Sequence, residues 1–406
     1  MSGHEASFFP FGLFMMRHMK TGQTEDAGED TDGAQSLRQT FRARMEAFAR
    51  TNVAPRSDWR DHEVIPADLW RAFGDAGLAG IGLPETLGGC GGDYRALAMA
   101  AETLAAVGGV KGIVSCWLSR QTIARLHILR LGDSAQRAAY VPKLASGVMT
   151  PCMAISEPGA GAHPKHLKTS ATRDGADFIL NGEKAYLTNG PIADLFLVLA
   201  ITGVENGRKQ FSVLLVPGDA PGVERTEGVK IDYLRPAPHC GLKLTDVRVP
   251  ATNILGPEGD AFTAISLPMR RTEDALAAAS MAGSMRHQIA QFAHEVDPGA
   301  LDDDDMAELG WLAATPDGLW AMAYHAAELL DLDPEANADE ISSIAAAARD
   351  GSRVQQQRIG ALMDKSGLAA SSGLAAERRD LEKTLGIART AHIIQARRRA
   401  VALMEA

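Results

Sequence analysis

The spacing of apolar residues divides the chain into three blocks. Over residues 36–150 apolar side chains recur at helical spacing, as in the run around Leu97, which predicts a helical domain. Over residues 151–255 β-branched residues, alternation and turn signals predict short strands. Helical spacing returns over residues 256–406 and predicts four long helices, over residues 275–296, 306–332, 340–363 and 381–404, which fit a bundle. We therefore expect an α+β fold with an N-terminal helical domain, a middle β-domain and a C-terminal four-helix bundle.

The middle block is expected to form a small barrel or sandwich. Asn181 and Gly182 lie between two apolar runs, and an Asn-Gly pair in this setting is a strong signal of a tight hairpin turn. Further short strands are predicted over residues 195–203, 211–218 and 244–250. Several short strands joined by turns favour a β-barrel as the middle domain.

Composition and charge exclude several classes of protein. Apolar residues make up 46% of the 406 residues and charged residues 23%, which is typical of a globular protein. No run approaches the roughly 18 apolar residues of a membrane span. The net charge of -10 argues against nucleic acid as the main partner, because phosphate binding needs a basic face. The four cysteines lack CxxC spacing, so we expect neither a metal site nor a disulfide framework.

The N-terminal segment, residues 1–35, is expected to be a disordered tail. Residues 21–35 are polar, acidic and glycine-containing, a composition that buries too little apolar surface to fold. His4 and Glu5 stand where a signal peptide carries basic residues, and no small-residue cleavage site follows. We therefore expect a cytoplasmic protein.

The loop ISEPGAGAHPKHLKTSA, residues 155–171, carries the most polar chemistry. Gly159 and Gly161 follow an apolar strand and are spaced as in loops that cradle phosphate groups. The loop lacks the Gly-Lys-Ser/Thr end of a P-loop, and Pro164 stands where a dinucleotide fingerprint has its third glycine. Taken alone, the loop is better explained as a glycine turn of a β-domain.

Several motifs in the same order resemble the acyl-CoA dehydrogenase family along nearly the whole chain from Ser36. ISEPGAGAH resembles the family's T-E-P-G-A-G-S-D, and LNGEKAYLTNG resembles L-N-G-x-K-x-W-I-T-N-G. VRVPATNILGPEGDAF resembles V-R-V-P-x-x-N-x-L-G-x-x-G-x-G-F, and AGLAGIGLPETLGGCGGDY resembles the family's N-terminal loop. The resemblance implies the acyl-CoA dehydrogenase fold, with its three domains in the order given above.

The resemblance also implies a flavin enzyme that dehydrogenates an acyl-CoA thioester. FAD would lie between the β-domain and the bundle, and the substrate would lose an α-proton to a carboxylate and a β-hydride to flavin N5. Electrons would pass to oxygen or to an electron-transfer flavoprotein, and a homodimer or homotetramer is implied. The positions that match the family's flavin contacts are Met153, Ala154, Ile155, Ser156, Gly161, Tyr186, Leu187, Thr188, Thr390 and His392.

The chain departs from the family at the catalytic position and at the subunit contact. The family's usual base is the Glu of Tyr-Glu-Gly-Thr, and the matching residue here is Ala388, which accepts no proton. The Gly-Gly-x-Gly and Arg-x-x-Phe-Gly sequences that reach FAD across the subunit contact are missing too. Ala162 and His163 replace the Ser-Asp pair after GAG, so the substrate-binding position of Ala162 has lost a hydroxyl.

A substitute base is expected at Glu273. Some family members, the isovaleryl-CoA type among them, carry the base in L-E-R-L-V-L-A-G-G-P-L-G, and aligning its last glycine with Gly283 places that glutamate at Glu273. Arg271 and Asp274 then match an Asp and an Arg that bind the CoA arm, with the charges exchanged. The alternative is that Glu273 only begins a helix after an N-cap at Thr272, where acids gain about 0.3 to 1 kcal/mol from the helix dipole.

Three functions are therefore open at the level of sequence. The first is FAD-dependent α,β-dehydrogenation of a CoA thioester with Glu273 as the base. The loss of the usual base also allows flavin-dependent oxygenation or epoxidation of a CoA ester, as in related oxygenases of secondary metabolism, including tropone-type antibiotic pathways. The missing subunit motifs allow a binding protein of this fold that has lost catalysis.

Overall fold

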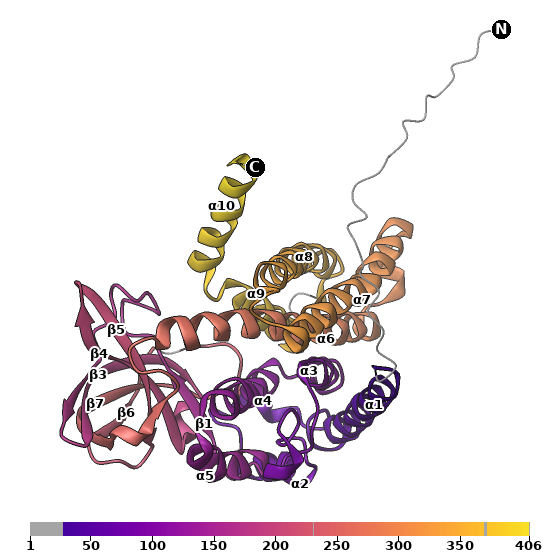
Figure 1. Cartoon of the computed structure of the whole chain (residues 1–406). Coiled ribbons are helices and arrows are strands. Elements are labelled where there is room, and N and C mark those ends of the chain that lie inside the picture. The colour runs from indigo at the N-terminus through magenta and orange to yellow at the C-terminus, as the bar shows by residue number, and fades with distance from the viewer. Residues whose placement is uncertain (1–26, 230, 369–371, 406) are drawn as a thin grey trace.

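The computed structural model describes residues 27–229, 231–368 and 372–405, and it consists of helices, a sheet and a second set of helices in chain order (Figure 1). This order confirms the predicted α+β fold. The disordered tail expected over residues 1–35 is wrong for residues 27–35, which begin helix α1 (Ala27–Asn52). Phe41 and Met45 anchor α1 in the core, and a helix extends from such an anchor at little cost per residue. Residues 1–26 lie outside the described residues.

The N-terminal helices share one apolar core with the first C-terminal helix, α6 (Leu267–Glu295). That core includes Phe73, Trp117 and Leu276. Helix α3 meets α6 closely at Gly283, where a Cβ atom would lie 2.2 Å from the carbonyl oxygen of Glu102. The elements of this part are α1, α2 (Ala67–Asp75), α3 (Tyr94–Gly108), α4 (Lys111–Thr122), a π-helical turn (Ile123–Leu129), α5 (Ser134–Ala145), and 3-10 turns at Asp58–Asp61 and Glu85–Leu87.

The middle part is a curled sheet of eight strands within the described residues. The order is β6-β7-β3-β2-β4-β5-β8, with β1 parallel to β4. Among the described residues, the end strand β6 pairs only with β7, and the other end strand, β8, pairs only with β5. The barrel is therefore open between β6 and β8. The strands are β1 (Pro151–Ala154), β2 (Ser170–Asp174), β3 (Asp177–Thr188), β4 (Leu195–Glu205), β5 (Arg208–Pro217), β6 (Val223–Thr226), β7 (His239–Pro250) and β8 (Ile254–Leu255), with 3-10 turns at Gly190–Ile192 and Ala251–Asn253.

The hairpin turn predicted at Asn181 and Gly182 is wrong, because β3 runs through both residues. The turn between β2 and β3 lies at Gly175 and Ala176 instead. At Gly182 the register between β3 and β7 shifts, and a Cβ atom would come within 2.5 Å of Thr169 Oγ1. Gly182 therefore allows a β-bulge in β3 and the close approach of Thr169.

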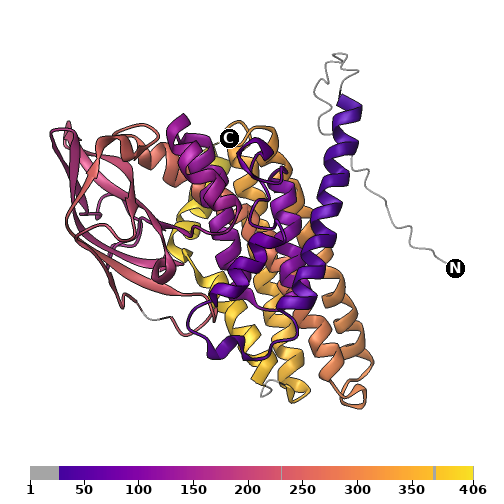
Figure 2. The ribbon, with the colours of Figure 1, turned by 90° about the horizontal axis from the view of Figure 1, so that it is seen from below.

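The C-terminal helices stack beside the N-terminal ones, with the sheet at one side and α1 at the opposite edge (Figure 2). The single helix predicted over residues 381–404 is wrong, because the chain breaks at Ile387 and Ala388, and Ala388 has φ 56°. The last helix, α10, then projects from the body (Figure 1). The elements are α6, α7 (Asp303–Leu332), α8 (Ala338–Lys365), α9 (Ser372–Gly386), α10 (Arg389–Glu405), a 3-10 turn at Pro298–Ala300 and a π-helical turn at Phe262–Ser266.

Among the described residues, no helix combines the length and the apolar character needed to cross a membrane. The fold and its element order are confirmed, whereas the limits predicted for the separate domains stay a prediction.

Candidate functional site

The loop after β1 is fixed from inside the β-domain by a buried ion pair. Lys184 Nζ donates to Glu157 Oε1 at 3.0 Å and to the carbonyl of Ile155 at 3.1 Å. The Glu157 carboxylate also accepts the N–H groups of Lys168 and Thr169 at 2.7 and 2.9 Å. Burial alone would raise the pKa of Glu157, but the hydrogen bonds from Thr169 and the charge of Lys184 outweigh it and lower that pKa. Burial lowers the pKa of Lys184 to about 8. One pair therefore holds both ends of the loop.

The inner part of this loop is a tight turn with an open outer face. Gly159 and Gly161 have left-handed φ values of 71° and 56°, and Glu157 and Gly161 exchange both backbone hydrogen bonds at 2.9 and 3.0 Å. The carbonyl of Ser156 accepts the N–H of Ala185 on β3 at 2.8 Å. Apart from each glycine and its two chain neighbours, no described atom lies within 4 Å of the place where a Cβ of Gly159 or Gly161 would stand. A rigid loop with open space in front of its glycines can hold a ligand against the backbone.

Tyr186 stands out of the sheet at a second bulge of β3. The register against β7 shifts between Lys184 and Leu187, and Tyr186 takes φ 61°, which is costly for a bulky residue. Its side chain is 50% exposed, whereas Leu187 is buried. Thr188 follows with Oγ1 3.0 Å from His239 Nε2. The bulge thus presents an aromatic ring beside the loop after β1.

The β-domain meets the helices along one seam, which we call the domain junction (Gly112, Asn189, Leu234 and Asp380). Asn189 Nδ2 at the end of β3 donates to the carbonyl of Cys116 on α4 at 3.1 Å. Asp380 of α9 accepts the N–H of Leu234 at 2.7 Å. Gly112 at the start of α4 is pressed against Leu234, because a Cβ there would lie 2.1 Å from the Leu234 carbonyl oxygen. Residues far apart in sequence therefore meet at α4 and at the middle of α9.

Glu273 lies in the interior of α6, not at its start. The helix begins at Leu267 after a π-helical turn, so the N-cap predicted at Thr272 is wrong, and Thr272 is buried. The alternative that Glu273 only begins a helix is therefore wrong as well. Met269, one turn earlier, packs against an apolar cluster that includes strands of the β-domain. Ser280, two turns later, is bonded to Lys111 of α4. This side of α6 therefore borders both the β-domain and α4.

The carboxyl group of Glu273 has the properties of a general base. It is half-buried, and no hydrogen bond or ion pair to it is found among the described residues. Burial raises the pKa of Glu273 to about 7, Arg270 opposes this rise, and the charge of Asp274 adds to it. A carboxyl group that titrates near neutral pH is suited to take up a proton from carbon.

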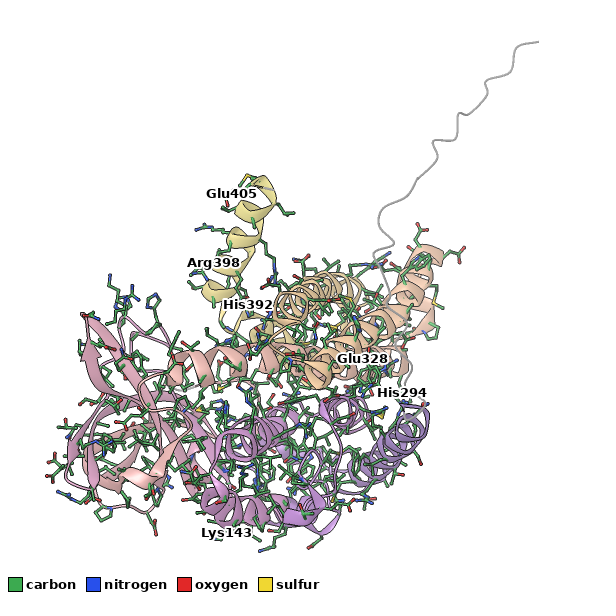
Figure 3. The ribbon with its side chains drawn as sticks, in the orientation of Figure 1. Lys143, His294, Glu328, His392, Arg398 and Glu405 are labelled. Atoms are coloured by element: carbon green, nitrogen blue, oxygen red, sulfur yellow. The ribbon has the colours of Figure 1, made fainter. Side chains whose placement is uncertain are left out.

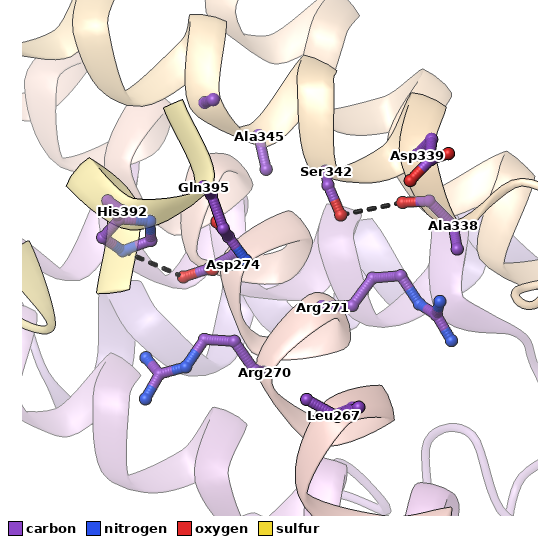
Figure 4. Close-up of a pocket in the computed structure, with 11 residues that line it drawn as sticks. Leu267, Arg270, Arg271, Asp274, Ala338, Asp339, Ser342, Ala345, His392 and Gln395 are labelled. Carbon is purple, nitrogen blue, oxygen red and sulfur yellow. Dashed lines mark hydrogen bonds and ion pairs between the residues drawn. The ribbon is translucent and has the colours of Figure 1, made fainter. Parts of the chain in front are cut away.

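A cavity of about 220 Å³ lies on the neighbouring face of α6, between α6, α8 and α10 (Figure 4). Asp274 Oδ1 lies 3.4 Å from Arg349 Nη2 and 3.7 Å from His392 Nε2. Arg271 pairs with Glu335 at 2.6 Å. Burial lowers the pKa of His392, the charge of Asp274 opposes this, and neighbouring arginines reinforce it. The cavity is lined by Leu267, Arg270, Arg271, Asp274, Ala338, Asp339, Ser342, Ala345, Ala346, His392 and Gln395.

Arg349 is a residue of this site that the motifs did not reveal. The resemblance places an arginine at the position of Asp274, and Arg349 of α8 brings a guanidinium to within 3.4 Å of that aspartate. Arg349 also donates to the carbonyls of Leu385 and Ile387 at 2.9 and 3.4 Å, next to Ala388. The signal in the sequence is weak: a single arginine that follows a run of alanines in a predicted helix.

The structure gathers the predicted site residues into two groups. The first group is Arg271, Glu273 and Asp274 in the N-terminal half of α6, with His392 on α10. Thr390 is exposed in the first turn of α10, and no contact of Thr390 or His392 with the loop after β1 is found among the described residues. The other group, on β1, β3 and the loop between β1 and β2, is Met153, Ala154, Ile155, Ser156, Gly161, Ala162, Tyr186, Leu187 and Thr188. The role of each residue stays a prediction.

Within the described part of the chain, no group of three or more His, Cys, Asp or Glu side chains is arranged to hold a metal ion.

Known proteins are similar to this chain in both sequence and fold. The family models for the N-terminal and middle domains of acyl-CoA dehydrogenase match residues 36–148 and 152–247. An acyl-CoA dehydrogenase of Bacillus subtilis (strain 168) is 29% identical over 71% of this chain and 78% of its own length. A probable acyl-CoA dehydrogenase of the same organism is 31% identical over 55% of this chain, and the match spans only 59% of that protein.

A solved structure supports the same assignment over more of the chain. A probable acyl-CoA dehydrogenase from Mycobacterium abscessus has a TM-score of 0.73 at 28% identity, over 87% of this chain and 94% of that one. The two family models together span just over half of the 406 residues, and they end before α6. The chain therefore belongs to the acyl-CoA dehydrogenase family, whose members are FAD-dependent oxidoreductases.

Proposed function

We propose that the protein oxidises the α,β-bond of an acyl-CoA thioester with FAD as the hydride acceptor and Glu273 as the base. The observation that carries the proposal is the half-buried Glu273 carboxylate, which has no partner among the described residues and a pKa of about 7. A C–H bond next to a thioester is a very weak acid, so its removal needs a carboxylate in a water-poor place. The position of Glu273 in a helix interior leaves a capping role without support.

The residues after β1 and in β3 fit FAD. Tyr186 offers an exposed ring for the flat flavin, and the hydroxyl groups of Ser156 and Thr188 lie on the neighbouring loop and strand. The Oδ1 atom of Asn189 is buried without a hydrogen bond among the described residues, so the end of β3 keeps an unsatisfied acceptor. When bound, FAD supplies the two-electron acceptor for the hydride that leaves the β-carbon.

The cavity beside Glu273 suits part of the CoA arm. Arg270 has no ion pair or hydrogen bond among the described residues, and Arg271 lies beside it on α6 (Figure 4). Such guanidinium groups attract the phosphates of CoA. Asp274 is held by Arg349 and His392, so it neutralises part of this charge. We therefore assign the thioester end of CoA to the border between this cavity and Glu273.

Anaerobic mixing with a panel of acyl-CoA esters tests the proposal. FAD-loaded protein that loses its visible flavin absorbance with at least one ester, and releases the unsaturated product, supports dehydrogenation. Product oxygen that derives from the gas phase would replace the proposal by an oxygenase. Protein that binds no FAD at all would favour a binding protein without catalysis.

A further inference from the structure

Lys111 is buried near the proposed base and has no counter-ion among the described residues. Lys111, the first residue of α4, is 4% exposed, and its Nζ donates to Ser280 Oγ of α6 at 2.6 Å. Ser280 Oγ in turn donates to the carbonyl of Ala277 at 2.9 Å. No ion pair of Lys111 is found among the described residues. One hydroxyl does not compensate the cost of burying an ammonium group, so the charged form of Lys111 is costly unless an anion joins it.

Asp380, the acidic side chain whose charge reaches Lys111, is already paired. Asp380 of α9 accepts Arg60 Nη1 at 2.6 Å and the N–H of Leu234 at 2.7 Å. Glu377 of α9 pairs through Oε1 with His287 at 3.0 Å, and its Oε2 has no hydrogen bond among the described residues. Burial lowers the pKa of Lys111 to about 7, and the more distant Asp380 opposes this. A lowered pKa is the expected response of a buried ammonium that lacks its own carboxylate.

The backbone at this point also favours an anion. Lys111 opens a helix of 12 residues, and a positive side chain is unfavourable at the positive end of a helix dipole. Val110 at the N-cap provides no side-chain acceptor. No acceptor for the N–H groups of Lys111 and Gly112 is found among the described residues. Free N–H groups at a helix start, together with an ammonium and a hydroxyl, form a set of donors for an anion.

The position of this donor set relative to Glu273 indicates which anion it binds. Ser280 follows Glu273 by seven residues, so the two lie on one face of α6 about 10 Å apart along the axis. Ala277 lies between them on that face and has only a methyl side chain. An acyl group whose α-carbon is at Glu273 and that extends along this face reaches Ala277 before Ser280 and Lys111.

We propose that Lys111 and Ser280 bind a carboxylate at the far end of the acyl group, so that the substrate is the CoA monothioester of a dicarboxylic acid. This inference rests on the proposed function, because it takes the acyl group to start at Glu273. It adds a specificity site at the start of α4 that no motif in the sequence indicates.

Binding and reduction measured on matched thioesters test the specificity site. Succinyl- to suberyl-CoA are each compared with the methyl-ended acyl-CoA of the same chain length, by calorimetry under argon and by bleaching of the flavin. We expect the wild-type protein to bind the carboxylate-ended member of at least one pair about tenfold more tightly or better. Lys111→Met should reduce this preference by about tenfold to a hundredfold, without weakening the binding of the methyl-ended ester.

Each outcome separates the specificity site from the proposed function. Equal affinity within every pair, or a preference that Lys111→Met retains, overturns the specificity site. Bleaching by methyl-ended esters together with equal affinities leaves the dehydrogenase standing without this site. A carboxylate preference that Lys111→Met abolishes, with no bleaching by any ester, supports the site and removes the proposed chemistry.

Two further variants complete the test. Lys143→Met changes an exposed lysine of α5 at the outer surface (Figure 3) and should leave the preference unchanged. Ser280→Ala should weaken the binding of carboxylate-ended esters several-fold, in the same direction as Lys111→Met. If Lys111→Met does not fold, Ser280→Ala decides the question, and an unchanged preference in it overturns the proposal.

Discussion

Replacing Glu273 by Gln removes the proposed base and keeps the shape of the side chain. Burial raises the pKa of Glu273 to about 7, so about one tenth of these groups are ionised at pH 6 and about nine tenths at pH 8. The wild-type rate of anaerobic flavin reduction should therefore rise roughly tenfold over this range. A general base contributes about 10² to 10⁴ in rate, and Glu273→Gln should lose that factor at pH 8.

Stopped-flow absorbance of the flavin band under argon measures both effects. Glu295→Gln is the matched control, because Glu295 is an exposed carboxylate at the end of the same helix, and its rate should equal that of the wild type. A rate for Glu273→Gln within a factor of two of the wild type would remove Glu273 from the mechanism. A wild-type rate that stays level or falls between pH 6 and pH 8 would refute the assignment of a base with a pKa near 7.

The same carboxyl group predicts a change in stability that needs no substrate. Its pKa rises from 4.5, the value of an unperturbed group, to about 7 in the folded protein. The folded state therefore holds this proton more tightly than the unfolded state does, and it loses stability as the pH rises from about 4.5 to 7. Glu273→Gln escapes this loss, so its melting temperature should exceed that of the wild type at pH 8 but not at pH 4.5. A variant that melts at or below the wild-type temperature at pH 8 would contradict the raised pKa.

Three other variants address the rest of the site. Lys184→Met leaves the Glu157 carboxylate buried without its cation, at a cost of about 3 to 5 kcal/mol, so thermal unfolding should occur earlier and FAD should be lost faster on dialysis. Unchanged FAD retention would mean that this pair does not position the loop. Ala388→Glu in the Glu273→Gln background should restore at least about tenfold in reduction rate, because it returns a carboxylate to the family's usual position; no recovery would show that residue 388 does not reach the same carbon. Asp274→Asn removes a negative charge from the cavity, so calorimetry at low salt should show tighter binding of acyl-CoA, and weaker binding would contradict the assignment of the CoA arm.

The fold was predictable from the sequence because it rests on periodicity and on ordered motifs. Apolar runs in β4 and β5 and helical spacing in α3, α6, α7 and α8 persist over long segments, and such patterns survive tertiary packing. Local turn chemistry was less informative. Asn181 and Gly182 have the composition of a hairpin turn, but the close approach of Thr169 and the shift of register between β3 and β7 favour a glycine at 182. Thr272 has the chemistry of an N-cap, but the π-helical turn before α6 moves the helix start to Leu267.

The candidate site was predictable only where it follows a motif. Glu273 and the loop after β1 were found by matching the family. Lys111 and Arg349 were not, because their roles depend on which helices meet. Lys111 contacts Ser280 across a sequence separation of 169 residues, and Arg349 contacts Asp274 across a separation of 75 residues. Local spacing along the sequence does not reveal contacts over such separations. Lys111 and Arg349 therefore look like ordinary surface residues until the packing of the helices is known.

The most direct test of the central claim is an anaerobic titration of the FAD-loaded protein with acyl-CoA thioesters, followed by mass analysis of the products. The account predicts that at least one thioester bleaches the flavin and is recovered two hydrogen atoms lighter, in an amount equal to the flavin reduced. A flavin that binds and stays oxidised with every thioester would contradict it.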